Sequence, residues 1–338
     1  MPQDFVSIII LTSKWEDQGR HLDKCLQGIY RQSFREFEII LVTNGLGKNQ
    51  VNDLKNRHTK VKIIENEENK GCAGGRNQGI RKAQGNYIVT LDDDAVPDNK
   101  WLEELMRWAS KSERVGMLAS KMLFSSNPYI IDSAGLEISR DGNAYSRKGL
   151  SKDGGLEQTE EIFGPCGGAA FYKREVFEDI GLFDEDYFIY YEDIDLAFRA
   201  RLAGWECLYV PQAVVFHHHS WSLGEESSSK IFLLERNRIL TILKNWPLRY
   251  LICYSPLIAA CDILADGYYL FKKRDLSRFK AKVSALKQLP RVLRERSKIQ
   301  SNRKISYEDM DKFWGPYYSP WSIYQRRRRL NHILKQTQ

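Results

Sequence analysis

The chain has 338 residues, of which 42% are hydrophobic and 28% are charged, with a net charge of +7. This length and composition fit one α/β domain with an appendage and exclude a disordered chain. The cysteines show no C-x-x-C pairing, which argues against a structural zinc site and predicts the reduced thiols of a cytosolic protein. The N-terminus lacks a basic segment followed by an apolar one, so we expect no signal peptide.

The charge is divided unevenly along the chain. Residues 225–338 contain 24 Lys and Arg against 10 Asp and Glu, a net charge of +14, whereas residues 1–224 contain 27 against 34, a net charge of −7. A basic half of this kind indicates a polyanionic partner, either a membrane surface or a nucleic acid. We therefore predict an N-terminal domain over 1–224 and a basic helical region over 225–338.

The N-terminal part alternates between predicted strands and helices. Val6–Thr12 is a continuous apolar run, typical of a strand that is covered on both faces. Apolar residues recur at helical spacing from Leu22 to Ile29, and two more strand-like runs follow at 37–42 and 61–65. This alternation predicts βαβ units around a mostly parallel sheet, whose ligands bind outside the carboxyl ends of the strands.

A glycine-rich stretch, Asn69–Ile80, lies between the third and fourth predicted strands. Glycine permits tight turns and a close approach to the backbone, and the start of the following helix offers free N–H groups to an anion. The stretch therefore predicts a loop for a nucleotide phosphate, and the alternative is a loop that only turns the chain. It does not match the dinucleotide fingerprint, which follows the first strand.

The stretch Gly85–Asp98 contains an apolar, β-branched run that ends in three successive carboxylates. Because side chains alternate across a strand, Asp92 and Asp94 point the same way and Asp93 points the other way. Carboxylate oxygens suit Mg2+ or Mn2+, and a cation between two carboxylates relieves their repulsion. The triplet predicts a metal site, and the alternative is a solvated acidic turn that caps the next helix.

Residues 121–158 show little periodicity and predict loops and short strands. Further along, the aromatic stretch 183–191 leads to Glu192 and Asp193, and a helical pattern follows. Acids at a helix N-terminus are favoured by the helix dipole, so capping alone could explain Asp193. A carboxylate beside aromatic walls can also have its basicity tuned, which makes this pair a candidate general base.

Three adjacent histidines, His217, His218 and His219, follow the strand-like run Glu206–Pro211. Adjacent residues of an extended segment cannot all bind one ion, but alternation lets His217 and His219 share a side. Imidazole is a common ligand of divalent metals, although a histidine is more often a packed or solvated side chain.

From Lys230 onward the pattern is helical, and Tyr250–Phe271 is its most apolar segment. Asp262 and Asp266 interrupt that segment, and a charge inside a membrane is costly, so we expect a packed or in-plane amphipathic helix and not a transmembrane one. Basic clusters interleaved with Trp and Tyr follow. They favour an anionic membrane surface as the partner, with an ordinary solvated helical face as the alternative.

In their order, three of these segments resemble the family 2 glycosyltransferases with the GT-A fold, and most closely the bacterial rhamnosyltransferase-like branch. The segments are the strand Val6–Thr12, the motif Asn69-x-Gly71-x-Ala73-Gly74-Gly75-Arg76-Asn77-x-Gly79 and the strand end Leu91-Asp92-Asp93-Asp94. The resemblance covers about residues 5–245. It implies a Rossmann-like, mostly parallel central sheet flanked by helices, with a helical C-terminal extension.

The resemblance also implies roles for individual residues. Asp94 and His217 would ligate Mn2+ or Mg2+ against the donor diphosphate, and Asp193 would be the general base, with Glu192 as the alternative. Many relatives carry an acidic residue at the position of Asn44, so the nucleotide base stays open. The residues expected to bind the nucleotide sugar are Thr12, Trp15, Asn44, Gly74, Arg76, Asn77, Asp92 and Asp93.

The implied reaction is an inverting, metal-dependent transfer of a sugar from a dTDP-sugar or UDP-sugar, with rhamnose as a candidate, to a hydroxyl of a cell-surface glycan or lipid-linked precursor. We expect a cytoplasmic enzyme, held peripherally on the inner face of the membrane by its basic region, with no nucleic-acid partner. Two other classes stay open, a metal-dependent hydrolase and a polyanion-binding module. The oligomeric state is open as well.

Overall fold

The structure is a computed structural model that describes residues 4–13, 19–218 and 227–335. Its strands are β1 (Val6–Thr12), β2 (Phe37–Asn44), β3 (Lys62–Asn66), β4 (Tyr87–Asp92), β5 (Ala95–Pro97), β6 (Val115–Phe124), β7 (Asn127–Ser133), β8 (Leu136–Ile138), β9 (Ala144–Ser146), β10 (Glu160–Glu161), β11 (Ala169–Lys173) and β12 (Glu206–His217). Its helices are α1 (Arg20–Tyr30), α2 (Lys48–Arg57), α3 (Gly71–Lys82), α4 (Trp101–Ala109), α5 (Arg174–Ile180), α6 (Glu192–Leu202), α7 (Ser228–Asn245), α8 (Leu248–Gly267), α9 (Ser277–Lys287), α10 (Leu289–Ser301), α11 (Tyr307–Asp311) and α12 (Pro320–Lys335), with the short helical segments η2 (Glu185–Tyr187) and η3 (Tyr268–Lys273).

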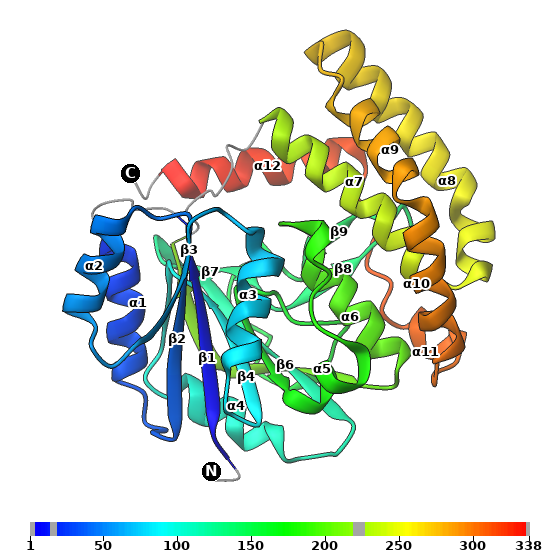
Figure 1. Cartoon of the computed structure of the whole chain (residues 1–338). Helices are drawn as coiled ribbons and strands as arrows, with labels where there is room; N and C mark the ends of the chain where they lie inside the picture. The colour runs from blue at the N-terminus through cyan, green and yellow to red at the C-terminus, as the bar shows by residue number, and fades with distance from the viewer. Residues whose placement is uncertain (1–3, 14–18, 219–226, 336–338) are drawn as a thin grey trace.

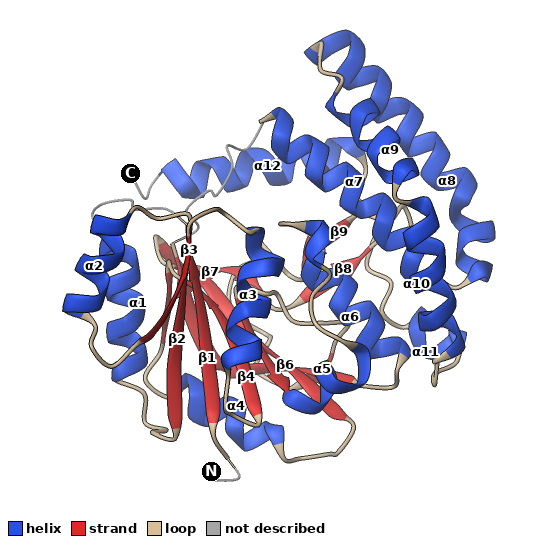
Figure 2. Cartoon of the chain, in the orientation of Figure 1, coloured by secondary structure: helices blue, strands red, loops and turns tan. Residues whose placement is uncertain are grey.

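A central sheet lies between helices, and the helices of the C-terminal region gather along one side of it (Figure 1 and Figure 2). Its strands lie in the order β10-β12-β6-β11-β4-β1-β2-β3, with β5 paired to β12 and β7 paired to β6. The run from β4 to β3 is parallel, whereas β11 is antiparallel to both of its neighbours. The α/β fold class expected from the sequence is therefore confirmed.

The chain reverses its direction of strand addition between β1 and β4. From β1 it continues outward through β2 to β3, and it then returns to place β4 on the other side of β1. Ligands of α/β sheets bind outside the carboxyl ends of strands at such a switch point. Here those ends are Thr12 and Asp92.

Both faces of the sheet are buried, which explains why the first strand is apolar without interruption. Ile8 and Ile10 of β1 belong to a core that includes Leu26 of α1 and Leu102 of α4. On the opposite face, Ile9 belongs to a second core formed with α3, α5 and α6. Successive side chains of a strand point to opposite faces, so β1 supplies both cores.

The glycine-rich stretch is mostly helix, so the expectation of a loop over 69–80 is wrong. The helix α3 already begins at Gly71. A Cβ atom added to Gly75 would lie 2.3 Å from Leu11, and one added to Gly79 would lie 2.5 Å from Ile9. These glycines therefore allow α3 to pack closely on β1. Close helix packing and phosphate binding both require glycines, so their spacing in the sequence does not tell the two roles apart.

Gly71→Ala is expected to destabilise the fold. The φ angle of Gly71 is +73°, and an added Cβ would lie 2.3 Å from the backbone oxygen of Phe188. A left-handed non-glycine residue costs about 1–3 kcal/mol before the clash is counted. Urea unfolding curves test this, with Gly47→Ala as the control, because a Cβ there meets no atom nearer than 3.5 Å. Equal unfolding free energies for the two variants would contradict the prediction.

The strand predicted at 206–211 is longer than expected, because β12 continues to His217. The pairing of β12 with β6 shifts between Val210 and Val214, and Pro211 lies inside this irregularity. A proline is tolerated there because it interrupts no regular ladder. The continuation places His217 opposite Ala95 of β5, directly after the acidic triplet.

The helix α7 joins the C-terminal region to the sheet domain. Its Leu240 and the adjacent Trp246 are fully buried, in one apolar cluster with Phe198 and Leu202 of α6. The segments α8, η3 and α9 form a hairpin whose tip projects from the body (Figure 1), while Ala281 and Ala285 of α9 are buried.

The segment Leu248–Lys273, which comprises α8 and η3, is the one helix of the described residues that is long and apolar enough to cross a membrane, and almost none of it is buried. The two acids that interrupt this segment face the neighbouring helices α7 and α9. Asp262 pairs with Arg238 of α7, and Asp266 pairs with Arg278 of α9. These two acids lie near the C-terminal end of α8, and the rest of the helix is apolar around most of its circumference, so the amphipathic pattern expected from the sequence is weak.

Candidate active site

The acidic end of β4 meets the end of β12. Asp94 Oδ1 lies 3.1 Å from His217 Nε2, and the ligand atoms of Asp92, Asp94 and His217 all lie within 4.8 Å of one another. The antiparallel pairing of β5 with β12 produces this contact, because Ala95 and His217 are register partners. Asp92 and Asp94 lie in one cluster, as expected, but strand alternation is not the reason, because β4 ends at Asp92 and the next two residues form a turn.

These three side chains fit a divalent cation. Two carboxylates and one imidazole are donors that Mn2+ and Mg2+ accept. His217 Nδ1 lies 2.6 Å from Asp132 Oδ2, while its Nε2 is directed at Asp94. A carboxylate behind an imidazole fixes the orientation of the ring, and this is the usual arrangement around a metal-binding histidine.

Asp132 was not among the residues predicted from the sequence. It lies near the end of β7 and is 7% exposed. The available signal was the pair Ile130-Ile131 followed by an acid, which is the pattern seen at the end of β4. This signal is weak because residues 121–158 show little periodicity, so the sequence does not indicate that Asp132 ends a strand.

The cluster contains more carboxylates than cations, so its electrostatic potential is negative. Burial lowers the pKa of His217, but Asp94 and Asp132 outweigh burial and raise that pKa well above its ordinary value. Burial and the charge of Asp94 raise the pKa of Asp93 to about 7, although a hydrogen bond with Thr12 opposes the shift. A site with this excess of carboxylates favours any positive charge, whether a proton or a metal ion.

Arg76 of α3 connects the acidic strand end to the start of α6. Its Nη1 donates to Glu192 Oε1 at 2.8 Å, and its Nη2 donates to Asp92 Oδ1 at 3.1 Å. Arg76 and Glu192 are both buried, so their ion pair is shielded from solvent, whereas the Asp92 side chain is 37% exposed. The candidate base and the candidate metal ligands therefore belong to one connected site.

The two acids at the start of α6 differ in their surroundings. Asp193 is partly exposed, and its carboxylate accepts hydrogen bonds from the backbone N–H groups of Gly167 at 3.0 Å and Ile194 at 2.8 Å. Glu192 is buried, and its Oε2 atom has no hydrogen-bond partner among the described residues. Burial raises the pKa of Glu192 to about 7, with the charge of Asp193 adding to the effect. Burial also raises the pKa of Asp193, against the two backbone hydrogen bonds.

Two residues expected to contact the donor are engaged elsewhere. Asn44 is 1% exposed, and its amide nitrogen donates to the Gly71 carbonyl at 3.1 Å, so it holds the start of α3. Asn77 donates to the Phe183 carbonyl at 2.8 Å and to Glu185 at 2.9 Å. Their burial and internal hydrogen bonds give both residues a structural role, and their contact with the donor stays a prediction.

The other predicted donor residues lie around the strand ends. Thr12 is at the end of β1, where it bonds to Asp93, and Gly74 is buried in α3. Asp92 belongs to the candidate metal cluster. Trp15 lies outside the described residues.

This sheet, with an acidic cluster at its switch point, defines a GT-A glycosyltransferase fold. The chain belongs to the glycosyl transferase family 2, whose model matches residues 8–181, and the protein is a glycosyltransferase. It is 28% identical over 243 residues to the N-acetylglucosaminyl-diphospho-decaprenol L-rhamnosyltransferase of Mycobacterium tuberculosis, which covers 63% of this chain and 76% of that one. The resemblance to the rhamnosyltransferase-like branch is therefore confirmed.

Further similarities agree with this assignment. The chain is 25% identical over 256 residues to the low-salt glycan biosynthesis hexosyltransferase Agl10 of Haloferax volcanii, covering 70% of this chain and 75% of that one. Among solved structures, it resembles GalNAc-T7 with UDP, GalNAc and Mn2+ (TM-score 0.59, 19% identity, 74% of this chain and 49% of that one). It also resembles S. aureus TarS (TM-score 0.56, 15% identity, 98% and 55%). The chain spans about half the length of these two structures.

Proposed function

We propose that this glycosyltransferase transfers a sugar from a UDP-sugar or dTDP-sugar, with rhamnose as the candidate sugar, to a hydroxyl of a cell-surface glycan or lipid-linked precursor, with inversion at the anomeric carbon. The observation that carries the proposal is the cluster of Asp92, Asp94 and His217 beside the pair Glu192-Asp193. The mycobacterial relative, named for rhamnosyl transfer to a diphospho-decaprenol-linked sugar, supports the choice of donor and acceptor.

In this mechanism Asp92, Asp94 and His217 hold Mn2+ or Mg2+, with Asp132 orienting the imidazole. A divalent cation bound there supplies positive charge against the diphosphate leaving group. The residues of the chain fit this role because they present two carboxylates and a single directed nitrogen to one point.

Asp193 accepts the proton of the attacking hydroxyl. We assign the base to Asp193 and not to Glu192, because Asp193 is partly exposed, whereas Glu192 is buried and paired with Arg76. The two backbone N–H groups that bind its carboxylate hold it in one orientation, which lowers the entropic cost of the proton transfer. Attack from the side opposite to the leaving diphosphate inverts the anomeric centre.

The proposal includes a cytoplasmic enzyme held peripherally on the inner face of the membrane. The apolar side of the hairpin exposes Ile263 (72%), Phe271 (81%) and Phe279 (66%). The cations Lys272 and Lys273 directly follow Phe271 in the sequence. An apolar surface bordered by cations suits the interface of an anionic bilayer.

Thermal-shift measurements with UDP, dTDP and GDP, with and without Mn2+, test the proposed function. We expect at least one nucleotide to stabilise the protein in Mn2+, by about 2.7 kcal/mol at a concentration one hundred times its Kd. The shift should disappear in Asp94→Ala and persist in the control Asp53→Ala, an exposed residue of α2. No shift with any nucleotide would count against the donor class, and a shift that persists in Asp94→Ala would refute the metal site.

Activity assays distinguish a glycosyltransferase from the alternative, a metal-dependent hydrolase. A metal-dependent hydrolase would release the sugar from its nucleotide at full rate without an acceptor, whereas a transferase needs an acceptor hydroxyl for rapid turnover. We therefore expect the release of nucleotide to be accelerated by acceptor and to be lost in Asp94→Ala.

A further inference from the structure

A cavity of about 470 Å³ lies next to the candidate active site. Its lining includes Asp132, which pairs with the candidate metal ligand His217, and Tyr191, which directly precedes Glu192. The cavity therefore borders both the candidate metal cluster, through Asp132, and the start of α6, through Tyr191. The remaining walls come from the segment 143–150, α7, the α8–α9 hairpin and α12.

The cavity lining carries more cations than acids. Its charged residues are Lys230, Arg238, Arg278, Arg326, Arg327, Asp132 and Glu235. Arg238 and Arg278 both pair with Glu235, so they neutralise the acid on that wall. The other charged residues of the lining are Lys230, Arg326 and Arg327 against the single acid Asp132. Arg326 lies over the ring of Tyr318, at 4.6 Å from its centroid, which leaves its planar guanidinium ordered beside the cavity. Ordered arginines are the preferred partners of phosphate.

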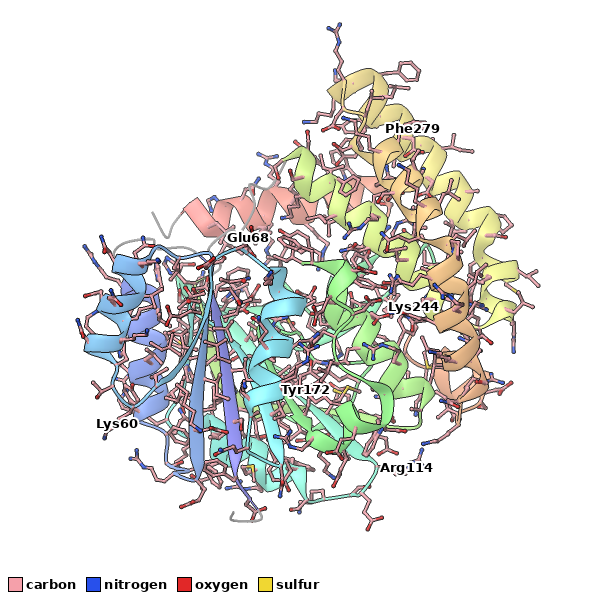
Figure 3. All side chains as sticks on the ribbon, viewed as in Figure 1. Lys60, Glu68, Arg114, Tyr172, Lys244 and Phe279 are labelled. Carbon is pink, nitrogen blue, oxygen red and sulfur yellow. The ribbon has the colours of Figure 1, made fainter. Side chains whose placement is uncertain are left out.

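The rest of the lining is apolar and leads to the exposed hairpin. Ile231 and Leu234 of α7 face Ile323 and Leu330 of α12 around the same space. Tyr269 and Arg278, which also line the cavity, belong to the hairpin. In Figure 1, α7 runs between α12 and the hairpin, and Figure 3 labels Phe279, whose side chain is exposed on α9. The cavity thus connects the active site with the apolar surface proposed to meet the membrane.

We propose that this cavity binds the acceptor, and that the acceptor is a lipid that carries phosphate. Its phosphate lies against Arg326, Arg327 and Lys230, and its hydrocarbon chain leaves along the hairpin toward the bilayer. A neutral soluble glycan would use neither the cations nor the apolar walls. The inference rests on the proposed function, since it assigns the acceptor side of the same site.

Farnesyl diphosphate, a short lipid diphosphate, is a probe for this site. Calorimetric titration of the full chain in EDTA removes any contribution of divalent metal to the binding. We expect farnesyl diphosphate to bind at least tenfold more tightly than inorganic pyrophosphate or farnesol. Arg326→Ala should weaken binding of farnesyl diphosphate by about tenfold or more, as for the loss of one charge-assisted hydrogen bond. The matched control is Arg329→Ala, an exposed residue of the same helix, which should leave the affinity unchanged.

A second variant probes the apolar wall. Ile323→Glu changes a cavity residue that is 39% exposed, so folding tolerates it, and it should weaken farnesyl diphosphate but not pyrophosphate. Equal affinity for pyrophosphate and farnesyl diphosphate would reveal a free-phosphate site and overturn the lipid assignment. If farnesyl diphosphate does not bind, or if Arg326→Ala and Arg329→Ala weaken its binding equally, then the cavity is not the acceptor site. If nucleotides still stabilise the protein with Mn2+ in that case, the transferase function stands and only this inference fails.

Discussion

Asp193→Asn is expected to lower kcat by about 10²–10⁴-fold, the usual contribution of a positioned general base. The amide keeps the size of the side chain but cannot accept the proton of the acceptor hydroxyl. The N–H groups of Gly167 and Ile194 bind different oxygens of Asp193, so the amide keeps one of these two hydrogen bonds, and the fold and the donor site should be preserved. Steady-state kinetics should therefore show a loss in kcat, with nucleotide binding in thermal-shift experiments unchanged.

The pH dependence of kcat provides a second measurement of the same role. A base acts only in its deprotonated form, and burial raises the pKa of Asp193 above the ordinary aspartate value. The rate of the wild type should therefore fall as the pH decreases through this raised pKa, and Asp193→Asn should lack that acidic limb. Because Glu192 and Asp193 are close, the limb reports the pair and not one residue alone.

Glu192→Gln is the matched control, since it changes the neighbouring acid in the same way. It weakens the ion pair with Arg76 and should cost less activity than Asp193→Asn. If Glu192→Gln loses more activity than Asp193→Asn, and Asp193→Asn keeps the acidic limb, then Glu192 is the general base. The unpartnered Oε2 atom of Glu192 makes that outcome a meaningful alternative.

The fold could be predicted because its signals are local. A buried parallel strand needs an apolar run such as Val6–Thr12, and an acid at a strand end needs no tertiary information to be noticed. The side-by-side placement of Asp94 and His217 depends on the pairing of β5 with β12, which the sequence does not display. The family resemblance implies that contact, whereas the spacing of the two residues in the sequence does not.

The remaining parts of the site depend on tertiary contacts. Asn44 and Asn77 have the residue type of ligand-binding amides, and only their buried partners reveal structural roles. The role of Asp132 depends on the pairing of β7 with β6. The sequence does not predict this pairing, because β7 lies in a stretch without clear periodicity. Local patterns identify candidate chemistry, whereas burial and partners decide which candidates carry it out.

The strongest long-range connection joins the C-terminal region to the candidate base. Asn237 of α7 donates hydrogen bonds to the carbonyl groups of Tyr187, Ile189 and Tyr190 at 2.9, 2.9 and 2.7 Å. Tyr190 and Tyr191 have positive φ angles of 69° and 67°, a conformation that non-glycine residues adopt only when their surroundings hold them. The helix α7 therefore fixes the segment that leads into α6, although the sequence suggested a separate basic region.

Lys244→Met is expected to lower the free energy of unfolding by about 3–5 kcal/mol, the cost of removing one partner from a buried ion pair. Lys244 is 1% exposed and lies where α7, α6 and α10 meet (Figure 3). Its Nζ is 2.7 Å from Asp184 Oδ2 and 2.8 Å from Asp195 Oδ1. Urea unfolding at pH 7 measures the loss, and Lys287→Met, an exposed position on α9, should change stability by less than about 0.5 kcal/mol.

The effect of Lys244→Met should depend on pH, with a sign that follows from Asp195. Burial raises the pKa of Asp195, but Lys244 and Arg199 outweigh burial and hold that pKa below its ordinary value. A lowered pKa in the folded state stabilises the protein above the ordinary aspartate pKa, and this stabilisation is lost as the pH falls through the folded-state pKa. The variant lacks the contribution of Lys244, so the difference from the wild type should be largest near pH 7 and should narrow in acid.

A double variant isolates the interaction. Asp195→Asn removes the buried charge that Lys244→Met leaves without its lysine, so the double variant should regain part of the lost stability relative to Lys244→Met alone. If the two losses simply add, and the difference from the wild type is the same at pH 7 and pH 4, then Lys244 stabilises through packing alone. In that case the ion pair would not explain how α7 holds α6 in place.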